Sequence, residues 1–337
     1  MEYRKIQKTG NSSFIVSLPK EWVTANNIHE QDKVGMITRQ DNILLIIPKV
    51  ANDYIQKEKS INVDHITNED FFYRLLLGAY IMGYNIIKVT CSERLDIGLK
   101  NVARKFIRDV IGLEIMEETQ HSLVIKDLLN STEMKFNSWI DRISQLVITQ
   151  YEDAMLAIEK RDEKLSKEII ARDAEVNRIH WLILRQHNIL QRNLLLSEQL
   201  GSGEKRDANF TLISRVIERI GDHAVRIAKN NWTLLEKELN PKIVENIGKA
   251  GKISMKIFRE SINAFNNEDI YAANANIDFS NKNLVIICES IEHDALDMET
   301  KQGITLGYIA ESIRRAGEYS IDLAEYIINY LTDKSKF

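Results

Sequence analysis

The sequence predicts a mainly α-helical protein with a small β module at its N-terminus, and two observations carry this prediction. From residue 132 onward, apolar residues recur with helical periodicity in long segments, and the 337-residue chain has only 3 prolines to interrupt them. Residues 1–49 differ, because short apolar runs alternate there with turn-forming residues. We therefore expect, in order, a β module, a small α/β segment and two three-helix bundles.

The β module is expected to span residues 1–49. Turn-forming residues at 10–13 separate two strand-like runs, and Pro19 suits the start of a helix. The expected elements are strands over 3–8 and 14–18, a helix over 20–26, and strands over 34–38 and 43–47. A module of this size without a disulfide or a metal buries too little surface to be stable alone. We therefore predict a homodimer that assembles through this module.

A short α/β domain is expected after a polar connector. The connector covers residues 50–67, and the domain covers 68–130. The expected elements are helices over 71–82 and 95–111 and strands over 85–90, 113–117 and 122–126. No motif in this stretch assigns it a ligand.

The region 132–337 is expected to form six long helices in two repeats of three. Breaks are expected near 161–162, 201–203, 240–241, 266–267 and 300–303. The third helix of each set carries a similar sequence, because the run that starts at Glu218 is echoed from Arg314, 96 residues later. We place the repeats at 132–235 and 241–333, each packed as an antiparallel bundle.

Composition and charge narrow the possible functions. Cys91 and Cys288 stand far apart, so they form neither a CxxC zinc pair nor a disulfide framework. The sequence shows no apolar leader and no run of about 20 apolar residues, so we expect a cytoplasmic protein without membrane insertion. The net charge of −4 confines any DNA contact to a local basic patch.

Two acidic residues on one helix form the first candidate site. Glu218 and Asp222 lie four residues apart, opposite an apolar stripe, so their carboxylates repel each other unless a cation lies between them. A divalent metal ion is one explanation. A solvent-facing ladder of ion pairs with Arg215 and Arg226 is the other. Gly221 costs about 1 kcal/mol relative to alanine within a helix, which indicates that something approaches the backbone closely there.

The run Glu-Arg-Ile-Gly-Asp-His-Ala at 218–224 resembles the signature of PhoU proteins. Members of that family consist of paired three-helix bundles whose Glu/Asp-xxx-Asp motifs bind metal ions, including iron or zinc clusters. The run 173–178 also resembles the family's second-helix pattern, in which an acid completes the site. The resemblance covers roughly 133–337. It implies Glu218, Asp222 and Asp173 as ligands of divalent or iron/zinc ions.

The second repeat departs from the family pattern. Arg314 stands where the first acid should be, which leaves Glu318 as the only acid at matching positions. Glu318 and Asp322 form a later carboxylate pair, for which we expect a surface held by salt bridges rather than a metal. In the first repeat, His223 is expected to be a partly buried, hydrogen-bonded residue.

Basic residues near the N-terminus form the second candidate site. Residues 1–20 contain four basic residues and one acidic residue, Glu2, so their net charge is +3. A dimer would bring about 8 cations to the phosphates of DNA, and the turn residues would add hydrogen bonds. The site comprises Arg4, Lys5, Lys8, Asn11, Ser12, Ser13 and Lys20. The alternative is a charged strand edge that prevents aggregation of a small sheet.

The same region is similar to AbrB/SpoVT swapped-hairpin domains. The similarity lies in the runs 4–12, 16–22 and 32–34, and the stretch Leu-Pro-Lys-Glu at 18–21 is the most specific part. In that family two chains exchange hairpins, and basic residues of the first hairpin and its loop contact DNA. The resemblance therefore implies a DNA-binding and dimerising domain over residues 1–49.

Two functions fit these features. In the first, the chain is a DNA-binding transcriptional regulator, and the PhoU resemblance implies negative control of phosphate uptake and phosphate homeostasis. In the second, the β module only dimerises, and the bundle acts as an adaptor for a phosphate transporter ATPase or a sensor kinase. Catalysis is not expected, because the sequence lacks a His-rich metal cluster, a phosphate-binding loop and a nucleophile elbow.

Overall fold

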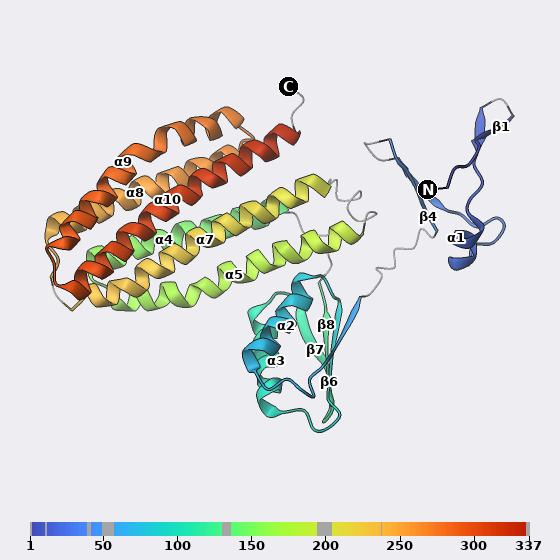
Figure 1. Ribbon diagram of the computed structural model, residues 1–337, viewed down its shortest axis with the longest axis horizontal. Helices are drawn as coiled ribbons and strands as arrows, with labels where there is room; N and C mark the ends of the chain where they lie inside the picture. The colour runs from blue at the N-terminus through green and yellow to red at the C-terminus, as the bar shows by residue number, and fades with distance from the viewer. Residues whose placement is uncertain are drawn as a thin grey trace. The chain divides into compact units, whose positions relative to one another are not determined.

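The chain divides into two compact units, Met1–Gln56 and Lys57–Phe337 (Figure 1). A computed structural model describes residues 2–10, 12–38, 42–48, 57–129, 136–193, 204–236 and 238–334. The first unit is rich in β-strand, whereas the second combines an α/β region with long helices. This mainly helical architecture confirms the predicted fold class.

The N-terminal unit contains two antiparallel hairpins and one short helix. Its elements are β1 (Gln7–Thr9), β2 (Ser13–Ile15), α1 (Lys20–Ala25), β3 (Gly35–Thr38) and β4 (Leu44–Ile47). β1 pairs with β2 and β3 with β4, in the predicted order, although the first two strands are shorter than expected. No described residue of this unit is buried, and Tyr3 and Phe14 are 84% and 71% exposed. A single copy of the unit therefore has no hydrophobic core.

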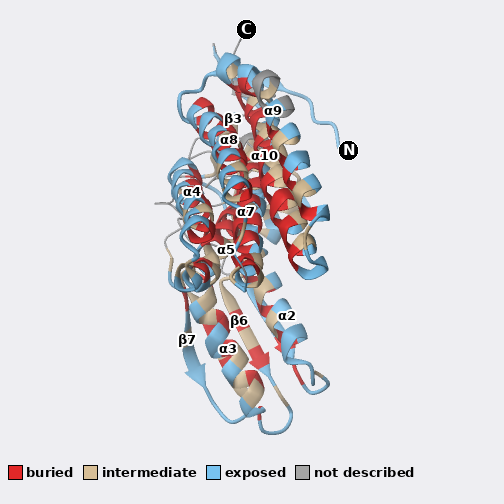
Figure 2. Cartoon of the chain, turned by 90° about the vertical axis from the view of Figure 1, so that its left-hand side faces the viewer, coloured by how far each residue is buried: buried red, intermediate tan, exposed pale blue. Residues whose placement is uncertain are grey.

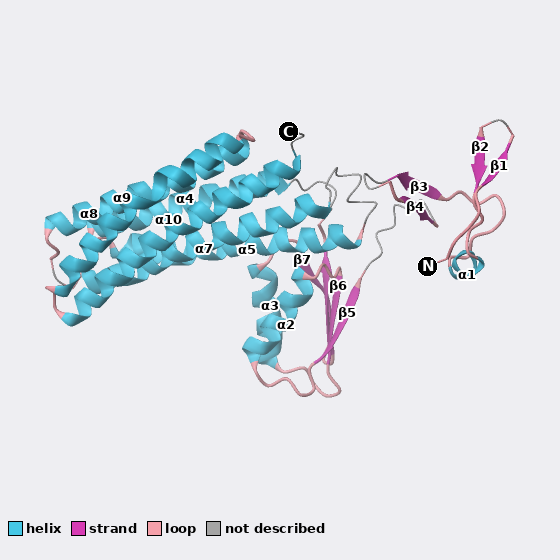
Figure 3. Cartoon of the chain, turned by 45° about the horizontal axis from the view of Figure 1, so that its top comes forward, coloured by secondary structure: helices cyan, strands magenta, loops and turns pink. Residues whose placement is uncertain are grey.

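The α/β region is a four-stranded sheet with two helices on one face (Figure 3). Its elements are β5 (Glu58–Asn62), α2 (Glu69–Ile81), β6 (Ile86–Thr90), α3 (Ile97–Asp109), β7 (Leu113–Glu118) and β8 (Ser122–Asp127). The strand order is β5-β6-β8-β7, and β5 pairs with β6 in parallel. Residues 50–67 were expected to be a polar connector, but part of this stretch forms the edge strand β5. Within β5 only Ile61 is buried.

Six long helices follow in the described part of the chain. They are α4 (Phe136–Lys160), α5 (Glu163–Arg192), α7 (Glu204–Leu234), α8 (Pro241–Asn266), α9 (Ile270–Leu296) and α10 (Thr300–Lys334). α7 packs against α4, α5 and α10, and α10 also packs against α8 and α9. Among the described helices, none combines the length and apolar character that a membrane span requires.

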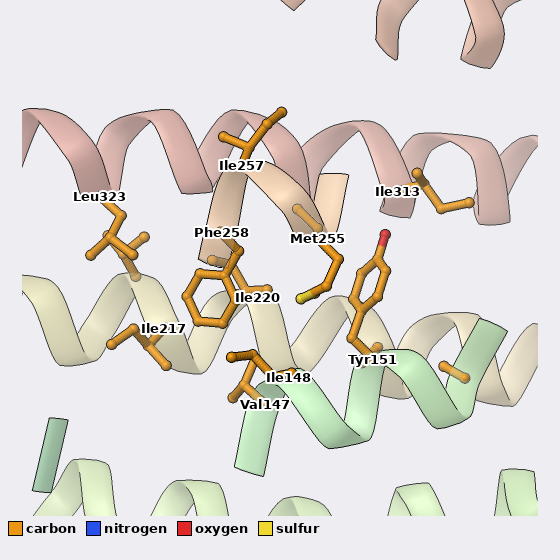
Figure 4. Close-up of a cluster of buried hydrophobic side chains, with 14 of the residues drawn as sticks. Val147, Ile148, Tyr151, Ile217, Ile220, Met255, Ile257, Phe258, Ile313 and Leu323 are labelled. Carbon is orange, nitrogen blue, oxygen red and sulfur yellow. The ribbon is translucent and has the colours of Figure 1, made fainter. Parts of the chain in front are cut away.

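The helices share one continuous hydrophobic core, which appears as red faces turned toward one another in Figure 2. Figure 4 shows side chains of α4, α7, α8 and α10 meeting there, among them Tyr151, Ile220, Phe258 and Ile313. The predicted breaks at 161–162, 240–241 and 266–267 coincide with helix ends, whereas 201–203 lies outside the described residues. The break expected at 300–303 is misplaced, because α10 already begins at Thr300.

Two equivalent glycines set the close packing of the repeats. A Cβ atom on Gly221 would lie 3.2 Å from Val147 Cγ2, and one on Gly317 would lie 2.3 Å from Leu284 Cδ2. Both positions sit on the third helix of their set, 96 residues apart. The expected close approach to the backbone at Gly221 is confirmed, and the approaching group is a core side chain.

A buried arginine joins the α/β region to α5. Arg185 is 1% exposed, and its guanidinium pairs with Asp127 at 2.5 Å. The same group donates to the backbone oxygens of Tyr80 and Tyr84, the latter at 3.0 Å. Its charge also lies 4.8 Å from the centre of the Tyr80 ring. These contacts satisfy a buried cation and fix the α/β region on the helical bundle.

Candidate functional site

The predicted acidic site lies where α5 and α7 pack together. Helical spacing places Glu218 and Asp222 one turn apart on α7, and Asp173 extends from the middle of α5. The charges of Asp222 and Asp173 both act on Glu218, and the charge of Asp173 also acts on Asp222. The structure therefore brings the three predicted residues into one electrostatic cluster, the α5–α7 acidic cluster.

Glu218 is the most deeply placed member of this cluster. The residue is only 9% exposed, and its Oε2 atom is buried with no hydrogen-bond partner. Burial, followed by the charge of Asp222, raises the pKa of Glu218 to about 7. Of the two alternatives, the ion-pair ladder requires Glu218 to face solvent, and the burial of this residue contradicts that requirement. Its helix is packed by α4, α5 and α10, which leaves little of the α7 surface open to water.

The other two acids of the cluster are more accessible. Asp222 is exposed, yet desolvation and the charge of Asp173 raise the pKa of its carboxyl. Burial also raises the pKa of Asp173, although Asn177 Nδ2 donates to Asp173 Oδ2 at 3.0 Å. All three carboxyls thus hold protons more tightly than they would in water, chiefly because burial disfavours their charged form.

An ion-pair ladder explains only part of this arrangement. Arg215 Nη1 lies 3.4 Å from Glu218 Oε2, as that interpretation requires. Within the described residues, however, Asp222 forms no salt bridge with Arg226 or with any other cation. Of the two ion pairs in the predicted ladder, Arg215–Glu218 is therefore present, and Arg226–Asp222 is absent among the described residues.

The side chains of the cluster are of the type that binds a divalent cation, but they lie too far apart to hold one ion together. Three carboxylates, one with a buried oxygen that accepts no hydrogen bond, are suitable ligands for a hard or borderline metal ion. Among the described His, Cys, Asp and Glu residues, however, no group of three lies close enough to hold one ion.

The matching surface of the second repeat is held by salt bridges, as predicted. Arg314 pairs with both Glu311 and Glu318, and Arg315 Nη1 lies 2.6 Å from the other oxygen of Glu318. Arg315 also donates to the Tyr319 hydroxyl at 3.0 Å. Arginine at the position of the first acid therefore replaces an unbalanced acidic pair with a neutralised network.

His223 differs from its prediction. The residue is buried, but its Nδ1 atom has no hydrogen-bond partner in the described structure. Its ring lies 5.6 Å from that of Tyr319 on α10. Burial, aided by the nearby charges of Arg226 and Arg315, lowers the pKa of His223 to about 4. The side chain is therefore a neutral part of the α7–α10 seam.

The N-terminal candidate residues lie on the surface of their own unit. Lys8 on β1 pairs in register with Phe14 on β2, and Ser13 pairs with Thr9, so these side chains flank one turn. Every described candidate here is exposed, namely Arg4, Lys5, Lys8, Ser12, Ser13 and Lys20. Arg4 forms an ion pair with Glu2, whereas the three lysines have no acidic partner among the described residues. Asn11 lies outside the described residues.

Comparison with known proteins identifies the helical region. Residues 140–230 match the family model described as the PhoU domain. The helical region of this chain is therefore similar to the PhoU domain. The PhoU match runs from α4 through most of α7 and includes Asp173, Glu218 and Asp222.

Known relatives of the PhoU domain support this assignment. A "Phosphate-specific transport system accessory protein PhoU homolog" of Xylella fastidiosa is 24% identical over 195 residues, which are 56% of this chain and 79% of that protein. A homolog of the same description from Clostridium acetobutylicum is 28% identical over 142 residues, 42% of this chain and 63% of that one.

Two solved structures share the PhoU fold. The phosphate transport system regulatory protein PhoU of Streptococcus pneumoniae aligns with a TM-score of 0.51 and 20% identity, over 59% of this chain and 94% of its own. PhoU of Pseudomonas aeruginosa gives a TM-score of 0.50 and 20% identity, over 61% and 99%. A large part of the present chain therefore has no counterpart in those two proteins.

The N-terminal unit matches a different model. Residues 7–53 match the family described as antidote-toxin recognition MazE, bacterial antitoxin. The match includes both hairpins and α1, in agreement with the predicted likeness to the AbrB type of module. It begins at Gln7, so the candidate residues Arg4 and Lys5 lie outside it.

Proposed function

We propose that this chain is a non-catalytic regulator of phosphate transport whose N-terminal unit binds DNA as a homodimer. The observation that carries the proposal is the combination, in one chain, of a PhoU domain with a unit that exposes basic residues. The named relatives are accessory proteins of phosphate-specific transport. A DNA-binding unit would let the PhoU domain control transcription directly, as a negative regulator of phosphate uptake in the cytoplasm.

The exposed apolar residues of the N-terminal unit support the dimer. Tyr3, Ile6, Phe14 and Met36 are each more than 60% exposed, and the unit has no buried residue in its described ranges. So few contacts do not stabilise a small module, and a second copy of the same hairpins offers a matching apolar surface. Analytical ultracentrifugation is expected to give a dimer, and Phe14→Ser is expected to weaken it.

The unpaired lysines support DNA as the partner. Lys5, Lys8 and Lys20 are exposed without an acidic partner among the described residues, so their charges are available to phosphates. Ser12 and Ser13 at the turn would add hydrogen bonds to the DNA backbone or to base edges. A dimer would double each of these contacts.

We also propose that the α5–α7 acidic cluster binds a divalent or iron/zinc ion through Glu218, Asp222 and Asp173. Burial raises the pKa of all three carboxyls, and the neighbouring acids add repulsion at Glu218 and Asp222, which a bound cation would relieve. Elemental analysis of the purified protein tests this proposal. Asp222→Asn should lower the metal content, and equal metal content in both proteins would contradict the assignment.

An adaptor role is the second candidate. The description of the relatives as transport-system accessory proteins favours it. In this case the hairpins only hold two chains together, and the bundle binds a phosphate transporter ATPase or a sensor kinase.

A mobility-shift assay separates the two functions. The full chain is incubated with DNA from upstream of phosphate-transport genes, beside a variant with Arg4, Lys5 and Lys8 changed to alanine. A matched control removes three cations from the helical region, with Lys160, Lys167 and Lys249 changed to alanine. The regulator predicts a complex that the first variant forms much more weakly and the control forms as the unaltered chain does. No complex with the unaltered chain, together with retention of a transporter ATPase by the first variant in a pull-down, would favour the adaptor.

A further inference from the structure

A groove between α4 and α5 contains two adjoining hollows on the outer face of the PhoU domain. Their volumes are about 560 and 580 Å³, and Arg142 lines both. The first hollow lies between α4 and α5, and the second extends to Ile111 of the α/β region. Each hollow falls in the range that small-molecule sites occupy. The groove therefore lies where the helical and α/β regions of one unit meet.

Two arginines in this groove lack partners for their charge. Arg142 forms no hydrogen bond or ion pair with any residue that the structure describes. Arg178 has a single long bond, in which Nη2 donates to Val110 O at 3.5 Å, and its buried Nε has no partner. A guanidinium offers five N–H donors. Those of Arg142 are exposed, whereas the buried Nε of Arg178 is a donor of the kind that proteins normally satisfy. Both side chains thus keep most of their donors for another molecule.

The acids that line the groove do not neutralise these arginines. Asp141 lies in the first hollow and Glu175 in the second, but neither forms a salt bridge with Arg142 or Arg178. Arg172, which also lines the first hollow, is already paired with Asp153 on α4. Arg142 and Arg178 therefore differ from Arg172, because neither of them forms a salt bridge with a described residue.

The second hollow also offers an apolar wall. Trp139, Ile111 and Ile179 line it together with the two arginines. Guanidinium groups bind phosphate through paired, charge-assisted hydrogen bonds, and an indole provides a surface for an aromatic or apolar group. We propose that this groove binds a small molecule that carries phosphate, with the phosphate on Arg142 and Arg178 and any apolar part on Trp139.

The position of this site links it to both regions of the second unit. Val110 and Ile111 belong to the α/β region, and the Tyr80 hydroxyl donates to Ile111 O at 3.0 Å. Arg185 holds the same region on α5 through Asp127. A ligand in the groove would therefore contact both regions and strengthen their contact. This site is separate from the α5–α7 acidic cluster and does not depend on DNA binding.

Direct binding to the purified full chain tests the proposal. Isothermal titration with inorganic phosphate, AMP and ATP is carried out in the presence of a chelator, so that a phosphate held by a metal ion does not contribute. Arg142→Gln and Arg178→Gln are compared with the unaltered chain. Arg259→Gln is the matched control, because it removes the same charge from an exposed ion pair with Glu152 on the same bundle.

Saturable binding of at least one phosphate compound is expected, with affinity reduced about 10- to 100-fold by either groove substitution and unchanged by the control. Binding of inorganic phosphate alone would identify the free ion as the ligand, and a preference for AMP or ATP would identify a nucleotide. Circular dichroism confirms that each variant is folded. The proposal is overturned if no compound binds, or if Arg142→Gln and Arg178→Gln both bind as the unaltered chain does.

Discussion

The pKa of Glu218 gives the sharpest prediction about stability. Burial and the charge of Asp222 raise this pKa from 4.5 to about 7 in the folded chain. The folded state therefore binds the proton more tightly than the unfolded state does. Stability that is present below pH 4.5 is lost as the pH rises to about 7, and the loss is complete above that pH.

The size of this loss follows from the difference in proton affinity. Each pKa unit corresponds to about 1.36 kcal/mol, so an ionised Glu218 costs about 3 kcal/mol above pH 7. Glu218→Gln removes the charge and keeps the shape. This variant should match the unaltered chain near pH 5 and exceed its free energy of unfolding by up to about 3 kcal/mol at pH 8.

Urea denaturation of the metal-free protein at pH values from 5 to 8 measures the effect. Glu245→Gln serves as the control, because this carboxyl is exposed and lies 2.6 Å from Lys249. The control should change the free energy of unfolding by less than about 1 kcal/mol. If Glu218→Gln destabilises the chain at pH 8, or if its effect does not vary with pH, the assigned burial of the carboxylate is wrong.

Three further predictions concern packing and protonation. Arg185→Met leaves Asp127 buried without its partner and should lower the free energy of unfolding by about 3 to 5 kcal/mol in urea titrations. Gly317→Val should cost about 1 to 3 kcal/mol by crowding Leu284, whereas Gly248→Ala, which meets no atom within 4 Å, should be neutral or stabilising in the same assay. The His223 imidazole should remain neutral down to about pH 4 in an NMR titration, while a midpoint near 6.5 would contradict its burial.

The sequence predicted helices better than strands, for physical reasons. Asparagine, proline and aspartate end or cap the long helices, so Asn240 with Pro241 and Asp162 marked real boundaries. β5 escaped prediction because an edge strand buries few side chains. Its sequence, Glu-Lys-Ser-Ile-Asn, has one apolar residue and no alternating pattern.

Sequence reasoning found the members of the acidic cluster but not their surroundings. The four-residue spacing placed Glu218 and Asp222 together, and the family resemblance added Asp173 from another helix. The depth of Glu218 could not be predicted, because it depends on how many helices surround α7. The groove was also missed. Arg142 and Arg178 are distant in sequence, and each looks like an ordinary charged residue on an amphipathic helix.

The salt dependence of DNA binding tests the proposed function most directly. If two chains bring Arg4, Lys5, Lys8 and Lys20 to the DNA backbone, about eight phosphate contacts form. The logarithm of the binding constant should then fall with the logarithm of salt concentration with a slope approaching −7. Alanine at Arg4, Lys5 and Lys8 should leave a slope near −2. A shallow slope for the unaltered chain, or equal slopes for both proteins, would contradict DNA binding by the N-terminal unit.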